Sequence, residues 1–127
     1  MFITADQLLA HLVGDYILQS DWMANEKTKS NVAASIHAFC YTLCFFPLIQ
    51  SSEQIGLIFW SHFFIDRFRL ARYLVWLKNW LGRNRPWREC SVTGYPDPRP
   101  AWMSVWLLII ADNILHIVIN GLALKYL

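Results

Sequence analysis

The stretch "SHFFIDRFRL", residues 61–70, places His62 and Asp66 four residues apart inside an otherwise apolar and aromatic run. A spacing of four puts both side chains on one face of a helix. Ionisable groups on an apolar helix are expensive unless they face the interior of a bundle and meet partners there. The stretch therefore predicts a helical fold built around an enclosed polar centre.

The same spacing recurs along the chain. Three of the four histidines have an aspartate four residues away, and the fourth, in "SIHAFCYTLC", has no acidic partner on its own helix. Because these side chains are spread over every predicted helix, we expect them to converge on one centre. The candidate residues are His11, Asp15, His37, His62, Asp66, Asp112 and His116.

The composition predicts an integral membrane protein. The chain has 127 residues, of which 56% are hydrophobic and seven are tryptophan, and this is too apolar for an ordinary soluble domain of that size. Residues 30–52 contain no Asp, Glu, Lys or Arg, and residues 100–124 contain only Asp112, so both windows reach the roughly 20 residues that cross a bilayer. We expect one all-α domain over residues 1–127, an integral membrane four-helix bundle. Its expected helices are 3–20, 31–50, 54–80 and 101–125.

Basic residues gather between the third and fourth apolar segments. They are Arg67, Arg69, Arg72, Lys78, Arg83, Arg85, Arg88 and Arg99, and tryptophans such as Trp80 flank the same region. The positive-inside tendency predicts that the loop over residues 82–100 is cytoplasmic, and its prolines predict no helix there. Contact with anionic lipid explains this charge, with phosphate gathering as an alternative; nucleic-acid binding is disfavoured because the charges border membrane helices.

Imidazole nitrogens and carboxylate oxygens together suit zinc, manganese or iron. Seven ligands fit one or two divalent ions with positions left for water or substrate. Hydrogen bonds between helices, or a relay for protons or ions, are the alternatives. Arg69 lies one turn beyond Asp66 and would neutralise that aspartate or clamp a phosphate. Cys40 and Cys44 share a helix face, where packing is expected rather than a soft metal site.

The motifs "HLVGDYILQSDWMANEK", "SHFFIDRFR" and "ADNILHI", with a histidine opening the second helix, resemble the small bacterial and phage membrane proteins of domain-of-unknown-function family 3307. That family is similar to YdjM-like inner-membrane proteins, described as membrane-bound metal-dependent hydrolases and likened to zinc-dependent phospholipase C and P1 nuclease. The resemblance implies a bacterial inner-membrane location, an all-helical fold and a phosphoester-cleaving zinc site whose ligands are the seven candidate residues. The chain differs from the soluble enzymes in being far shorter and in lacking their amino-terminal tryptophan ligand.

These observations predict a membrane-embedded metal-dependent hydrolase that cleaves a phosphoester, with a phospholipid or lipid phosphate as substrate. Asp66 or Asp15 would take the proton of the attacking water, and Arg69 would meet the phosphate. The alternatives are a small ion- or proton-handling membrane protein, and a metal-stapled interaction protein without catalysis. Since four helices are few for an alternating-access carrier, the ion-handling alternative favours a homo-oligomer.

Overall fold

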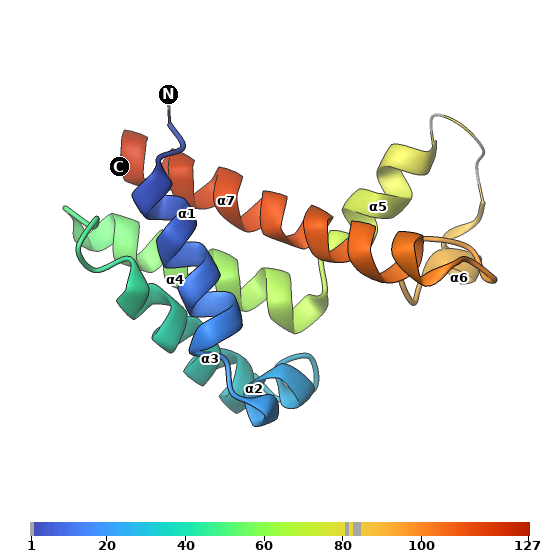
Figure 1. Cartoon of the computed structure of the whole chain (residues 1–127), viewed down its shortest axis with the longest axis horizontal. Helices are drawn as coiled ribbons and strands as arrows, with labels where there is room; N and C mark the ends of the chain where they lie inside the picture. The colour runs from blue at the N-terminus through green and yellow to red at the C-terminus, as the bar shows by residue number, and fades with distance from the viewer. Residues whose placement is uncertain (1, 81, 83–84) are drawn as a thin grey trace. The chain divides into compact units, whose positions relative to one another are not determined.

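The computed structural model describes residues 2–80, 82 and 85–127, and every regular element among them is helical (Figure 1). The predicted all-α fold class is therefore confirmed. The described residues form two compact units. Unit 1 comprises residues 2–68 with 116–127, and unit 2 comprises the described part of residues 69–115.

Unit 1 begins with α1 (Ala5–Leu12), which continues as a π-helical segment, η1 (Val13–Ile17). Thr4 starts α1, because its hydroxyl accepts a hydrogen bond from the Gln7 amide at 3.2 Å. In η1, a Cβ at Gly14 would lie 2.6 Å from the Tyr41 ring. The glycine therefore lets the start of η1 approach the helix that carries Tyr41, next to Asp15.

The structure differs from the sequence prediction at two further helices. A short helix that we did not predict, α2 (Asp21–Glu26), follows Ser20, whose hydroxyl caps it by accepting from the Met23 amide at 3.3 Å. The second predicted helix, 31–50, is shorter than expected: α3 (Asn31–Cys44) begins at its Ser30 cap and ends before Phe45. It packs along α4 (Ser52–Phe68) (Figure 1).

The predicted third helix, 54–80, is wrong as a single element. It is divided into α4 and α5 (Ala71–Trp80), and between them Arg69 has a φ of 52°. A left-handed residue cannot continue a right-handed helix, so the chain turns there. The predicted loop 82–100 also contains one short helix, α6 (Trp87–Cys90), preceded by Pro86. Residues 83 and 84 of that loop, Arg83 among them, lie outside the described residues.

The last predicted helix is confirmed. It consists of η2 (Trp102–Leu107) and α7 (Leu108–Tyr126), and this 25-residue helix is the one described helix long and apolar enough to cross a membrane. The 14 residues of α3 and the 17 of α4 span about 21 and about 26 Å, short of the roughly 30 Å hydrocarbon core. The described residues therefore do not show the four membrane-spanning helices that the sequence predicts.

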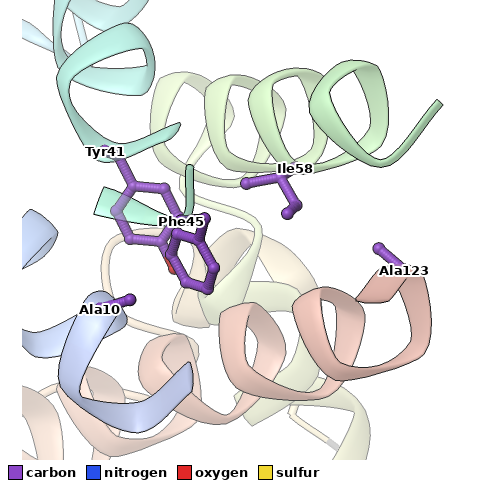
Figure 2. Close-up of a cluster of buried hydrophobic side chains, with 5 residues drawn as sticks. All are labelled: Ala10, Tyr41, Phe45, Ile58 and Ala123. Carbon is purple, nitrogen blue, oxygen red and sulfur yellow. The ribbon is translucent and has the colours of Figure 1, made fainter. Parts of the chain in front are cut away.

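An apolar cluster holds the helices of unit 1 together (Figure 2). The Tyr41 and Phe45 rings lie 5.0 Å apart between centroids, against Ala10 from α1, Ile58 from α4 and Ala123 from α7. The Tyr41 ring also stacks on His62, with 3.7 Å between centroids. Tyr41 therefore belongs to the apolar core of unit 1 and also contacts one of its buried polar residues, His62.

A separate apolar cluster forms the core of unit 2. Val75 from α5, Tyr95 from the loop and Ala111 from α7 are buried together, with Leu107 and Met103 packed against them. This cluster ties the loop after α6 to the helices on either side of it in the chain.

Candidate metal centre

Four of the predicted ligands meet in the interior of unit 1. Asp15 comes from η1, His37 from α3, and His62 and Asp66 from consecutive turns of α4. All four are buried, and one ligand atom of each lies within 4.8 Å of those of the others. Buried aspartate and histidine side chains are thus grouped so that they could hold a metal ion.

The distances between these four donor atoms are short and similar. The Nε2 atoms of His37 and His62 are 2.9 Å apart, and each lies 3.3 Å from Asp15 Oδ1. Asp66 Oδ2 lies 3.1 Å from His37 Nε2 and 3.2 Å from His62 Nε2. Four ligands at zinc-like distances of about 2.0–2.2 Å in a tetrahedron would be about 3.3–3.6 Å apart. A small outward shift of the donor atoms would therefore accommodate one tetrahedral ion.

Hydrogen bonding alone does not satisfy this group. An imidazole nitrogen has at most one proton to donate, yet each of the two Nε2 atoms faces the other ring and both carboxylates. Asp15 Oδ1 is buried and has no hydrogen-bond partner among the described residues. A cation between the four atoms would contact all of them at once, and two imidazoles with two carboxylates suit zinc, manganese or iron.

Each carboxylate turns its other oxygen towards a further histidine. Asp15 Oδ2 lies 3.4 Å from His11 Nδ1, and Asp66 Oδ1 lies 3.5 Å from His116 Nε2. Each carboxylate thus faces His37 and His62 with one oxygen and a further histidine with the other. This arrangement is compatible with one ion or with two. Unit 1 thus brings together six of the seven predicted ligands. The seventh, Asp112, lies one turn before His116 on α7, in unit 2.

Tyr41 and Asn120 support the centre and were not among the predicted ligands. Tyr41 Oη lies 2.8 Å from His11 Nδ1 and accepts a hydrogen bond from Asn120 Nδ2 at 2.6 Å. These contacts orient the His11 ring through Nδ1, which leaves Nε2 as the nitrogen that could bind a metal ion. The sequence held one usable signal, because Tyr41 follows His37 by four residues and so shares its helix face.

Family membership covers all of these residues. The family described as "Protein of unknown function (DUF3307)" matches residues 3–126. The chain belongs to this family. No curated protein and no solved structure matches it. The family description assigns no activity, so the function of this DUF3307 protein has to be argued from its own geometry.

Lys27 is the residue that sequence reasoning missed most clearly. Its Nζ lies 2.8 Å from Asp66 Oδ2 and 3.4 Å from His37 Nε2, and its side chain is 18% exposed. Arg67 holds the connection after Lys27 in place by donating to the Thr28 carbonyl and to Asn31 Oδ1, both at 2.7 Å. The histidine–aspartate spacing that identified the other candidates does not apply to Lys27, because it lies at the end of a short helix that the sequence did not predict. It connects the buried centre with the surface of unit 1.

Arg69, the arginine expected to meet a phosphate, lies in unit 2. Its side chain is exposed, and Nη2 donates to the Val92 carbonyl at 3.0 Å. Its role as a clamp stays a prediction. Cys40 and Cys44 are half-buried, and the Cys44 thiol donates to the Cys40 carbonyl at 3.6 Å. Among the described residues, the groups suited to a metal ion contain no cysteine.

Proposed function

We propose that this DUF3307 protein is a membrane-embedded, metal-dependent hydrolase that cleaves a phosphoester, with a lipid-linked phosphoester as its substrate. The proposal rests chiefly on the group formed by Asp15, His37, His62 and Asp66. Its neighbouring donor atoms lie 2.9–3.3 Å apart, and a lysine ammonium stands at its edge. Ligands for divalent cations next to a side chain that can bind phosphate are what phosphoester hydrolysis requires.

The number of ligands favours catalysis over a structural role. A structural zinc site is closed by four ligands, whereas His11 and His116 extend this centre beyond four. Lys27 also favours catalysis. A positive charge next to metal ligands is repelled by a cation, so a purely structural site would gain nothing from it.

Bound divalent cations would polarise the phosphoryl oxygens and lower the pKa of a water molecule to near neutrality. Asp15 and Asp66 would hold these cations through one or both oxygens, and an oxygen not saturated in this way could accept a proton from water. Lys27 would donate a charge-assisted hydrogen bond to a phosphate oxygen. Tyr41, held by Asn120, would keep the His11 ring in position.

The distribution of polarity in unit 1 supports embedding in a membrane. Its interior holds ten buried polar or charged residues, including four histidines and two aspartates. Its surface carries large apolar side chains, such as Leu9, Ile17, Val32 and Phe46, which are 63–73% exposed. Soluble domains rarely bury so many ionisable groups, and large exposed apolar surfaces mark contact with lipid or protein. A site enclosed in this way would receive a lipid by lateral diffusion more easily than a soluble nucleotide.

The direct test uses protein purified in detergent and loaded with zinc or manganese. We expect release of phosphate or headgroup from at least one member of a panel of phosphatidic acid, phosphatidylglycerol and lipid pyrophosphates. Asp66→Asn should abolish this release, because an amide is a poorer metal ligand and no base. The matched control is Glu53→Gln, which removes an exposed carboxylate from the same helix and should leave the release unchanged. Should metal-loaded wild type release nothing above Asp66→Asn on any substrate, the hydrolase proposal fails.

A further inference from the structure

Unit 2 contains a cavity of about 480 Å³, and none of the metal-centre residues lines it. Its wall includes Lys78 from α5, Arg85 before α6, and Tyr95 and Arg99 from the loop that follows. Among its described lining residues, three are basic and none is acidic, while Glu89 and Asp97 line an adjoining pocket that shares Arg85 and Arg99. The volume lies within the range of small-molecule binding sites, about 300–1,000 Å³.

One wall of this cavity is fixed by a glycine. Gly94 has a φ of 85°, and a Cβ there would clash with the Arg72 carbonyl of α5. Its amide donates to the Cys90 carbonyl at 2.7 Å. Glycine adopts this conformation readily and has no Cβ, so the turn at Gly94 can pack directly against the backbone of α5. Tyr95, the next residue, is thereby buried against Val75 and forms part of the wall.

The charges around the cavity are weakly compensated. Arg85 Nη1 lies 3.6 Å from Glu89 Oε2, and this pair is exposed. Within the part of the chain that the structure describes, neither Lys78 nor Arg99 has an ion-pair partner; the Lys78 Nζ lies 5.4 Å from the Tyr95 ring centroid. An anion entering this cavity would meet the Lys78 ammonium and the Arg99 guanidinium, neither of which forms an ion pair among the described residues.

Two further groups in the wall point to binding rather than covalent chemistry. Tyr95 is 4% exposed, and its hydroxyl has no hydrogen-bond partner among the described residues. A buried hydroxyl without a partner is unfavourable, and a bound acceptor would relieve this. Burial also raises the pKa of the Cys90 thiol, so it stays protonated and is a poor nucleophile.

We propose that this cavity binds a phosphate group carried on a small polar molecule. Arginine and lysine side chains pair well with phosphate oxygens, and the Tyr95 hydroxyl would supply a further hydrogen bond. The phosphate could belong to a lipid headgroup or to a soluble phosphate ester, which present the same chemistry. The site consists only of unit 2 residues, and it stands whether or not the metal centre is catalytic.

The test measures binding to the full chain in nanodiscs treated with chelator, so that the metal centre does not contribute. Isothermal titration with sn-glycerol 3-phosphate tests the soluble source. Native mass spectrometry of protein released from nanodiscs that contain phosphatidic acid and phosphatidylcholine tests the lipid source. We expect saturable binding in at least one arm, and the arm that binds identifies the source.

The decisive comparison is between two double variants that lose the same charge. Lys78→Gln with Arg99→Gln should weaken binding by roughly tenfold or more, as expected for the loss of charge-assisted hydrogen bonds. The control, Arg88→Gln with Lys125→Gln, removes exposed cations that do not line the cavity and should change binding less than about twofold. Lys78→Arg with Arg99→Lys should restore most of the affinity. Equal losses in both double variants, or no wild-type binding in either arm, would overturn the proposal.

Discussion

Lys27 brings a positive charge into a centre otherwise made of histidine and aspartate. If it contacts the substrate phosphate, Lys27→Gln should lower kcat/KM for phosphoester hydrolysis by about 10–100-fold, the value of one hydrogen bond to a charged group. Lys27→Arg should recover part of the loss. The metal content should not fall, because Lys27 is not a ligand.

Lys29→Gln is the matched control for Lys27. Lys29 is exposed and pairs with Glu26 at 3.1 Å, so its removal should leave hydrolysis unchanged. A Lys27→Gln variant with normal hydrolysis, or one that loses its metal, would contradict the role given to this residue.

Most of the candidate ligands could be predicted from the sequence because Asp15, Asp66 and Asp112 each lie four residues from a histidine, and helix geometry alone places such a pair on one face. The contacts of His37 were not predictable in the same way, since they come from η1, α4 and the end of α2. Lys27 reaches the centre because α2 turns the chain back towards α4. That turn is a tertiary feature with no periodic signal.

At the scale of the elements, the close approach of η1 to α3 positions Asp15. Gly14→Ala would push a methyl group into the Tyr41 ring, and we expect a loss of stability of about 1–3 kcal/mol, as for other overpacked sites. It should also weaken metal binding, because Asp15 is the next residue. Thermal unfolding in detergent with and without metal measures both effects.

Gly56→Ala provides the comparison within α4. Nothing lies within 4 Å of a Cβ at Gly56, and alanine is favoured over glycine in a helix by about 0.8–1.0 kcal/mol. We therefore expect this variant to match or exceed wild type in stability. If Gly14→Ala unfolds at the same temperature as Gly56→Ala, the packing of η1 against α3 is not as tight as described.

The lengths of the helices were harder to predict than their existence. The predicted helix 31–50 runs past Pro47, although proline favours a helix end before it, and α3 ends at Cys44. Residues 54–80 contain no proline that would mark the break between α4 and α5. The break at Arg69 follows from its positive φ, which is uncommon for a residue other than glycine. The longest helix was predicted well, because residues 101–125 contain one acidic residue and no proline.

For the whole molecule, the buried polar residues of unit 1 and its exposed large apolar side chains predict a protein that stays in the membrane. We expect the chain to remain in the pellet after alkaline carbonate extraction. In a chain whose three cysteines are replaced, Asp97→Cys should react with an impermeant maleimide only in inside-out vesicles, because the basic loop is expected in the cytoplasm. Labelling from the outer side of intact cells would contradict this orientation, and release by carbonate would contradict membrane embedding.

The central claim is that the buried histidine and aspartate residues hold a divalent metal ion, and elemental analysis of the purified protein tests it most directly. Protein prepared in detergent without chelator should contain about one or two equivalents of a divalent transition metal, zinc first, per chain. A double variant, His37→Ala with His62→Ala, should lose it. Asp6→Asn with Glu53→Gln, which removes two exposed carboxylates, should keep it. Wild type that contains no more metal than the histidine variant, even after incubation with zinc, manganese or iron, would contradict the claim.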